Sequence, residues 1–223
     1  MNGYEIVLEI SGNTAMWTRP DTGDCPVSYP APTYSAAKGI FESILWGPAV
    51  QVVPKKVEIC TPVQYHNYQT NYGGPLRKPG VIAGGGGFQL LATVLIDVCY
   101  RLYAEVSPIP RSVKKRVPDK ARRWDKKTTS PGHAYRDIFN RRLKRGQCFT
   151  LPFLGWKEFG PSYFGALRDT TKVQSDINMV IPSMLREVFS DGYASKCAFT
   201  YEQDVEITAG VMEFRRQGGQ HVE

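Results

Sequence analysis

The sequence predicts an α+β protein in which helices cover one face of an antiparallel sheet. Apolar patterns indicate strands near residues 4–10, 50–59 and 88–106, and two helical patterns lie between and after them. Beyond Cys148, short strand-like pieces alternate with glycine and proline turns. The order strand, helix, strand, excursion, strand, helix, strand fits a ferredoxin-like or RNA-recognition-motif-like sheet.

We expect the chain to divide into two parts. Residues 1–165 form the ferredoxin-like domain, with a glycine-rich excursion (61–89) and a basic helical insertion (108–146). Residues 166–223 form a smaller β-rich C-terminal part. With 223 residues, of which 42% are hydrophobic and 12% aromatic, the chain is large enough to bury a core.

The first strand and helix have clear boundaries. Residues 4–10 alternate apolar side chains with Glu5 and Glu9, as expected for a half-buried strand. Thr33 is the predicted N-cap of a helix that stops at Gly47-Pro48. The buried stripe of this helix is predicted to be Ala36, Ala37, Ile40, Phe41, Ile44 and Leu45.

The next strand, Val50 to Ile59, contains Pro54, which predicts a sheet edge or a bulge there. Residues 61–89 are polar, aromatic and glycine-rich, and their length predicts a long mobile or functional excursion. Residues 88–106 are apolar and rich in branched and aromatic side chains, which predicts a strand. Late strands are expected at 200–205 and 213–216.

A second helix is predicted to begin at Ser130-Pro131 and to run to Arg145, before Gly146. Arg142 falls within its apolar stripe, where it must reach out to solvent or find a partner. The stripe comprises Ala134, Tyr135, Ile138, Phe139 and Leu143.

The positive charge is concentrated in one segment. The formal net charge is +7, and residues 111–146 alone hold 14 Lys or Arg against 3 Asp or Glu. Aromatic residues interleave with these cations (Trp124, Tyr135, Phe139), and three tyrosines lie on the excursion. Such a mixture suits single-stranded nucleic acid, since cations pair with phosphates while bases stack on aromatic rings. A solvated face or a disordered basic loop is the alternative, and core packing is the alternative for Tyr135 and Phe139.

Several classes of protein are not indicated. The five cysteines are widely spaced without a C-x-x-C pair, which argues against zinc or disulfides and for a reducing cytoplasm. The glycine run 84–87 lacks the Lys and Ser/Thr of a phosphate-binding loop. No signal peptide pattern or 20-residue apolar stretch is present. We therefore expect a cytoplasmic protein without metal, cofactor or membrane contact.

Two long motifs resemble a known family. The segment PVSYPAPTYSAAKGIFESILWGP (26–48) and the segment FNRRLKRGQCFTLPFLGWKEF (139–159) are similar to signature blocks of the type I-C CRISPR "Cas five" subunit. The second follows the pattern F-x-RR-x-x-x-GQ-x-F-x-x-P-x-LG-x-x-EF. The resemblance covers most of residues 1–165 and implies an antiviral defence protein of the ferredoxin-like fold.

The resemblance also implies a function and partners. The expected role is to bind and cap the 5′ handle of the guide RNA in a surveillance complex (Cascade), and to process precursor guide RNA. The expected neighbours are the repeated backbone subunit and the large subunit, with target DNA reached through the complex. The residues expected to contact RNA are Lys38, Arg122, Arg123, Lys126, Lys127, Arg141, Arg142, Lys144 and Arg145.

Members that cleave RNA do so without a metal, through attack of a ribose 2′-OH on the adjacent phosphate. The resemblance implies a tyrosine at the end of the first helix and a Lys-His pair before the second. Here these positions hold Leu45 and Ala134-Tyr135, and His133 lies two residues from the expected histidine. A two-residue offset rotates a side chain by about 200° on a helix. His133 and Tyr135 are the candidate catalytic residues.

Three functions stay open at this point. The chain is an endoribonuclease that keeps its product, or a non-catalytic scaffold whose guide another nuclease cuts, or a general basic DNA-binding module.

Overall fold

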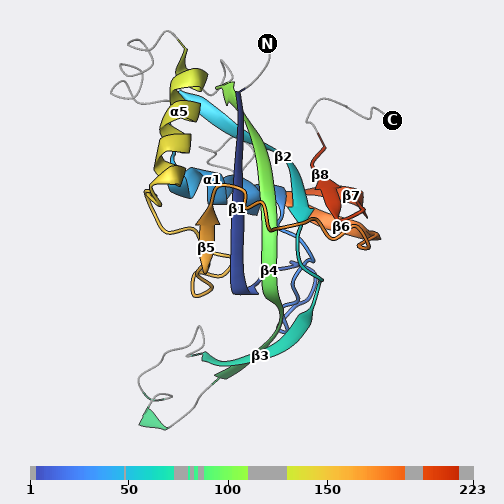
Figure 1. Cartoon of the computed structure of the whole chain (residues 1–223). Helices are drawn as coiled ribbons and strands as arrows, with labels where there is room; N and C mark the ends of the chain where they lie inside the picture. Colours follow the sequence, from blue (N-terminus) through green and yellow to red (C-terminus); the bar gives the residue numbers. More distant parts are fainter. Residues whose placement is uncertain are drawn as a thin grey trace.

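The computed structural model describes residues 4–47, 49–72, 80, 83–84, 88–109, 130–188 and 198–215. These residues form an antiparallel sheet with two helices packed on one face, which confirms the predicted α+β class (Figure 1). The helices are α1 (Tyr34–Ile44) and α5 (Pro131–Lys144). The strands are β1 (Tyr4–Ala15), β2 (Val50–Ile59), β3 (Tyr65–Tyr72), β4 (Phe88–Pro108), β5 (Tyr163–Gly165), β6 (Met179–Glu187), β7 (Thr200–Thr208) and β8 (Val211–Glu213).

Seven strands lie in the order β5-β1-β4-β2-β8-β7-β6, and β3 pairs with part of β4. β1 and β4 form the centre, where Tyr4 lies opposite Val106 and Ala15 opposite Leu95. The last three strands join the sheet because β8 pairs with Lys56 to Glu58 of β2. The C-terminal strands therefore extend the sheet, and the division of the chain at residue 165 stays a prediction.

Helix α1 is capped at both ends. The Thr33 hydroxyl accepts the N–H of Ala36 at 3.2 Å, which confirms the predicted N-cap. The helix ends at Ile44, before the predicted Gly47 stop, because Leu45 has extended backbone angles. Its buried residues are Tyr34, Ala37, Ile40, Phe41 and Ile44, and Ala36 and Leu45 are partly buried.

Strand β2 has the predicted bounds and a bulge at its proline. The register against β4 shifts between Pro54 and Lys56, since proline has no N–H to donate to the neighbouring strand. The bulge lies just before the segment that pairs with β8.

The predicted excursion at 61–89 is in part a strand. β3 pairs with Phe88 to Leu95 of β4, and the two form a hairpin that extends beyond the body of the sheet (Figure 1). Most described side chains of β3 are exposed or half-exposed, so no buried face imposes the alternation that reveals other strands. The predicted strand at 88–106 is confirmed as part of the longer β4.

Helix α5 begins at Pro131 after the N-cap Ser130 and ends at Lys144, close to the predicted limits. Beyond it, the N–H of Gln147 bonds the carbonyl of Arg142 and that of Gly146 bonds Leu143, with Gly146 at φ +62°. This pair of bonds is a Schellman turn, for which glycine is the favoured residue. The predicted stripe faces inward, with Tyr135, Phe139 and Leu143 buried.

The later strands are also close to their predicted positions. β7 begins at Thr200 as predicted and continues to Thr208. The strand expected at 213–216 was placed too late in the chain: β8 spans Val211–Glu213, residues 214 and 215 are not strand, and Arg216 lies outside the described residues.

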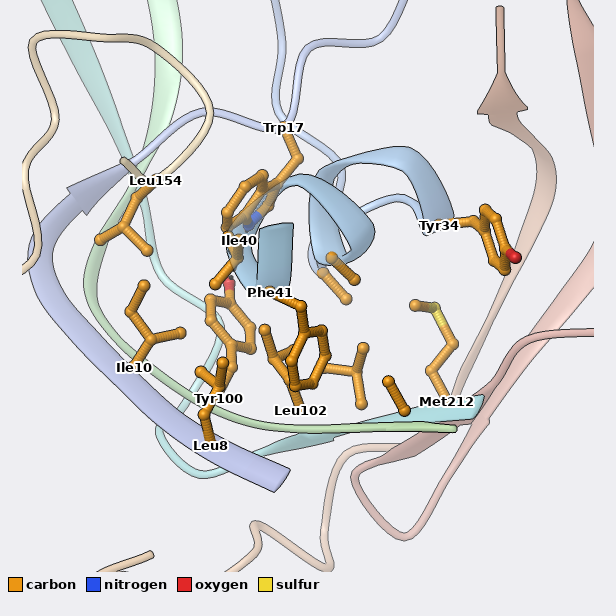
Figure 2. Close-up of a cluster of buried hydrophobic side chains, with 14 of the residues drawn as sticks. Leu8, Ile10, Trp17, Tyr34, Ile40, Phe41, Tyr100, Leu102, Leu154 and Met212 are labelled. Atoms are coloured by element: carbon orange, nitrogen blue, oxygen red, sulfur yellow. Dashed lines mark hydrogen bonds between the residues drawn. The ribbon is translucent and has the colours of Figure 1, made fainter. Parts of the chain in front are cut away.

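The core lies between the helices and one face of the sheet. Figure 2 shows side chains of β1 and β4, including Leu8, Ile10, Tyr100 and Leu102, pointing toward Phe41 of α1. Both helices belong to this core, since the ring centroids of Phe41 on α1 and Phe139 on α5 lie 5.8 Å apart. Residues from three other segments complete it, namely Trp17, Leu154 and Met212 (Figure 2).

The opposite face of the sheet is polar around a buried carboxylate. Glu9 is fully buried and accepts hydrogen bonds from Arg168 Nε at 2.6 Å, from the Arg168 N–H at 2.9 Å and from Thr171 Oγ1 at 2.8 Å. Arg101 lies 3.5 Å away and bonds the carbonyls of Arg168 and Thr171. These contacts tie the 168–171 segment across β1 and β4.

Candidate nucleic-acid interface

His133 lies in the first turn of α5 with its side chain half-exposed. Its Nδ1 atom is 3.2 Å from Oδ2 of Asp137, one helical turn further on, and its ring meets Tyr4 edge-on with centroids 5.7 Å apart. In the neutral imidazole, an Nδ1–H donated to Asp137 leaves Nε2 as the proton acceptor. Nε2 makes no hydrogen bond to any described residue, so it is available to a ligand.

A cation and a hydroxyl lie beside this imidazole. The Arg136 guanidinium pairs with Asp137 at 3.2 Å and lies 5.3 Å from the centre of the Tyr4 ring. The Tyr4 hydroxyl is 3.0 Å from the Ser130 hydroxyl. We call Tyr4, His133, Arg136 and Asp137 the His133 cluster. It combines a proton acceptor with a cation near the surface, two of the three groups, with a proton donor, that metal-independent attack on a phosphate uses.

Sequence reasoning found only one member of the His133 cluster. The spacing of His133 and Asp137 by four residues places them on one helix face and was a usable signal. Tyr4 gave no such signal because it lies on β1, far away in the chain, and only the packing of α5 on β1 brings it there.

Tyr135, the second catalytic candidate, lies in the core. It is 1% exposed, stacks on Phe139 and donates its hydroxyl to the carbonyl of Leu45. Burial raises the pKa of this phenol, and the nearby charge of Glu42 adds to the effect. The geometry therefore favours a packing role over proton transfer to an RNA at the surface. The two positions implied for the lysine and tyrosine of the family hold Ala134 and Leu45, which carry no ionisable group.

Arg142 has found a partner, as its place in the apolar stripe required. Its Nη1 donates to the carbonyl of Ile44 at 2.8 Å. The carbonyls at the end of α1 would otherwise lack partners, because no following turn of helix supplies N–H groups. With Tyr135 on Leu45, two side chains of α5 thus complete the C-terminus of α1. Part of the Arg142 side chain stays exposed.

Lys38 lies on α1 beside a carboxylate. Its ammonium is 4.0 Å from Glu42, four residues along, and both side chains are about one-quarter to one-third exposed. Burial raises the pKa of Glu42 and the Lys38 charge opposes this shift. Glu42 is a titratable group that sequence reasoning did not single out, and a single carboxylate on a helix face gave no signal for it.

Three of the predicted RNA-binding cations are exposed on the last turn of α5: Arg141, Lys144 and Arg145. None of them makes an ion pair with a described residue, so no described carboxylate neutralises their charges. Basic side chains at a helix C-terminus also interact favourably with the helix dipole. Four other predicted contacts lie outside the described residues, namely Arg122, Arg123, Lys126 and Lys127.

Large apolar side chains lie exposed next to these cations. After the turn at Gly146 the chain runs beside the end of α1, where the N–H groups of Phe149 and Thr150 both bond the carbonyl of Ser43, at 2.9 and 3.0 Å. We call residues 146–155 the 146–155 loop. Three of its side chains face solvent, with exposed fractions of 76% for Phe149, 61% for Leu151 and 45% for Phe153. From the sequence, these three residues were recognised only as part of the family motif at 139–159, and their exposure was not predicted.

Within the described part of the chain, no cluster of three or more His, Cys, Asp or Glu side chains is arranged to hold a metal ion. Among the same residues, neither helix is long and apolar enough to cross a membrane.

The antiparallel sheet with its two helices defines an α+β protein. The exposed cations of α5 give this protein a surface suited to a polyanion. The family model described as CRISPR-associated protein (Cas_Cas5) matches residues 5–174, about three quarters of the chain. The chain therefore belongs to the Cas5 family of CRISPR-associated proteins, as the two sequence motifs implied.

Two curated proteins are similar to this chain, and both are named CRISPR pre-crRNA endoribonuclease Cas5d. The protein from Mannheimia succiniciproducens is 28% identical over 204 residues, which cover 82% of this chain and 84% of that protein. The protein from Thermus thermophilus is 29% identical over 162 residues, which cover 71% of this chain and 62% of that protein.

Solved structures share the fold. A crystal structure of a CRISPR-associated protein superposes with a TM-score of 0.67 at 18% identity, covering 96% of this chain and 93% of the other. An uncharacterised protein from Streptococcus mutans gives the same TM-score at 17% identity, covering 96% and 94%. A chain of a CRISPR RNA-guided surveillance complex gives a TM-score of 0.52 at 13% identity, covering 94% and 90%.

Proposed function

We propose that this chain is the subunit of a type I-C-like CRISPR surveillance complex (Cascade) that binds and caps the 5′ handle of the guide RNA and processes its precursor. The observation that carries the proposal is the family match over residues 5–174. The names of both curated relatives identify precursor guide RNA as their substrate. The exposed cations Arg141, Lys144 and Arg145 support an RNA-binding role, because phosphates pair with exposed Lys and Arg.

The proposal includes neighbours and location. The repeated backbone subunit and the large subunit adjoin this chain in the complex, target DNA is reached through the complex, and the complex acts in the cytoplasm. The similarity to a chain of a surveillance complex supports an assembled role.

We also propose a ferredoxin-like core for residues 1–165, followed by a C-terminal part (166–223) with strands of its own. The strand order β5-β1-β4-β2, with α1 after β1 and α5 after β4, supports the first assignment. The exclusive pairing of β6 and β7 with strands of the last third supports the second.

Cleavage of the precursor is assigned to the His133 cluster. Nε2 of His133 takes the proton of a ribose 2′-OH, whose oxygen attacks the adjacent phosphorus. The bond from phosphorus to the 5′ oxygen breaks, and the leaving oxygen takes up a proton from water, so the products are a 2′,3′-cyclic phosphate and a 5′-OH. Asp137 holds the imidazole through Nδ1, and Arg136 lies near enough to stabilise charge on the phosphate.

A non-catalytic scaffold is the second candidate. Leu45 and Ala134-Tyr135 stand where the family resemblance implies a tyrosine and a Lys-His pair, and the Tyr135 hydroxyl is used inside the protein. On this reading the chain holds a guide that another nuclease has cut.

Incubation of the purified protein with the repeat RNA of its own CRISPR array, in EDTA, separates the two candidates. The enzyme is expected to cut at one site and leave a cyclic phosphate, and His133→Ala is expected to abolish cutting while RNA affinity is kept. Tyr135→Phe is the matched control, since it removes a buried hydroxyl on the same helix and is expected to lower stability but not cutting.

The other outcomes assign the function differently. Tight binding without cutting by the wild-type protein supports the scaffold and contradicts the enzyme. Equal binding to duplex DNA of any sequence, without preference for the repeat RNA, supports the general DNA-binding module and contradicts the guide-RNA proposal.

A further inference from the structure

We propose that Phe149 is a base-stacking residue, against which an unpaired base of the bound RNA packs while Arg141, Lys144 and Arg145 contact the adjoining phosphates. This inference rests on the proposed function and adds a specific aromatic contact to it. Phe149 has the largest exposed fraction, 76%, of the exposed large apolar residues in the described part of the chain.

The position of Phe149 is fixed by the backbone and not by its side chain. The Schellman turn at Gly146 directs the chain toward α1, and the N–H groups of Phe149 and Thr150 share the carbonyl of Ser43. At the other end of the 146–155 loop, Leu154 is fully buried and its carbonyl accepts the N–H of Met16 at 2.9 Å (Figure 2 shows its side chain in the core). The backbone of the loop is therefore already ordered around the exposed Phe149 ring. Binding of RNA to this ring would cost little further backbone entropy.

The chain on either side of Phe149 is rich in cations. Residues 138–157 contain five Lys or Arg and no Asp or Glu, and three of these cations are exposed without a partner among the described residues. Arg145 and Phe149 flank the Schellman turn, four residues apart in the chain, and both are exposed. Single-stranded nucleic acid binds to such a combination, because phosphates pair with cations and every base has a face that can stack.

A protein partner is the competing occupant, because Leu151 and Phe153 are exposed on the same loop. The absence of any carboxylate in residues 138–157 favours the polyanion. We therefore assign Phe149 to RNA and treat protein docking as an outcome that would overturn the assignment.

The test compares four variants for binding to the repeat RNA by fluorescence anisotropy. Phe149→Ala is expected to weaken binding about 5- to 150-fold, the range for loss of one base–aromatic stack. Phe149→Trp is expected to keep the affinity because it keeps an aromatic face, whereas Phe149→Leu is expected to lose it despite being apolar. Leu151→Ala is the matched control on the same loop and is expected to bind RNA as the wild type does.

A second readout locates the base. With 2-aminopurine placed in turn at each unpaired position of the repeat RNA, stacking should quench its fluorescence at one position, and Phe149→Ala should restore it. An unchanged melting temperature is expected for these variants, since the side chain is mostly in solvent.

The outcomes separate this inference from the proposed function. Normal RNA binding by Phe149→Ala and Phe149→Leu, together with weakened binding when Arg141, Lys144 and Arg145 are replaced, overturns the stacking role and leaves the proposed function intact. Equal losses for Phe149→Ala and Leu151→Ala, without quenching at any position, also overturn stacking and indicate an apolar docking surface. Failure of the wild-type protein to bind the repeat RNA contradicts the proposed function itself.

Discussion

Adjacent arginines on α5 have different surroundings and should have different roles. Arg142 donates to the carbonyl of Ile44 at the end of α1, while Arg141 is exposed and has no ion pair with a described residue. A charged donor that satisfies a carbonyl at a helix end stabilises the fold more than an exposed cation that interacts only with the helix dipole. We therefore expect the two arginines of the motif to differ, Arg142 supporting the fold and Arg141 contacting the RNA.

Arg142→Ala should lower the free energy of unfolding by about 2 kcal/mol, because a hydrogen bond to a charged donor is lost and the Ile44 carbonyl is left unpaired. In a chain of this size that corresponds to a fall in melting temperature of roughly 4–8 °C. Arg141→Ala is the control: its melting temperature should fall much less, since only the interaction with the helix dipole is lost, while its affinity for RNA falls. Equal melting temperatures for both variants would show that the contact with Ile44 contributes nothing.

Glu9 should make stability depend on pH. Burial by itself would raise the pKa of this carboxyl, but the hydrogen bonds from the Arg168 backbone and side chain and from Thr171, with the Arg168 charge, outweigh it and lower the pKa. A lowered folded-state pKa contributes stability that is present above the unfolded pKa of about 4.3 and is lost as pH falls through the folded value.

Glu9→Gln should therefore cost about 2 kcal/mol of unfolding free energy at neutral pH, and the difference from the wild type should shrink below pH ~4 as the wild-type carboxylate is protonated. Urea denaturation over that pH range measures both effects. Glu5→Gln, exposed on the same strand, should show neither. A difference that stays constant with pH contradicts the assignment to ionised Glu9.

At the scale of elements, the 146–155 loop depends on two glycines for different reasons. Both have positive φ, +62° at Gly146 and +90° at Gly155. A Cβ on Gly146 would meet nothing within 4 Å, whereas a Cβ on Gly155 would lie 1.8 Å from the carbonyl oxygen of Met16. The second glycine is required for the close approach of two backbones, and the first only for its backbone angle.

Gly146→Ala should lower the free energy of unfolding by about 1–2 kcal/mol, because a residue with a Cβ is strained in the left-handed conformation. Gly155→Ala adds a clash with backbone that cannot move aside, and we expect this variant to lose native packing or to be insoluble. Circular dichroism melts of the two purified variants measure the difference. Similar small losses of melting temperature in both variants would show that the backbone near Met16 can move to accommodate a Cβ at residue 155.

At the scale of the whole molecule, the charge is divided between two surfaces. The outer face of the sheet holds paired charges, such as Glu9 with Arg168 and Lys56 with Glu58. At the end of α5, Arg141, Lys144 and Arg145 are exposed and make no ion pair with a described residue. A polyanion should therefore bind at α5, and its binding should respond to salt through those residues.

RNA affinity should fall with rising salt by about 0.7 in log–log slope for each phosphate contact. Replacement of Arg141, Lys144 and Arg145 by Ala together should reduce that slope by about 2 if each contacts one phosphate. Lys172→Ala is the control: it removes an exposed cation directly after the 168–171 segment and should leave the slope unchanged. A slope that the triple variant does not alter would place the RNA elsewhere on the protein.

The sequence by itself determined those features whose signals are local. The N-cap at Thr33, the bulge at Pro54 and the ends of α5 at Pro131 and Gly146 follow from the backbone chemistry of single residues. The buried stripes follow from helical and strand periodicity, and the family follows from two motifs. Strand β3 was not predicted from the sequence, because a polar hairpin has no buried face and so shows no alternation of apolar and polar residues.

Only the tertiary structure decided what the side chains do. Tyr135 and Arg142 complete the end of α1, and Tyr4 approaches His133, because α5 packs across α1 and β1. The exposure of Phe149 likewise depends on a backbone bond to Ser43. These contacts join residues far apart in the chain, and side-chain chemistry alone cannot distinguish a tyrosine or arginine that caps a helix from one that meets a ligand. The fold decides this by burying some groups with their partners and leaving others in solvent.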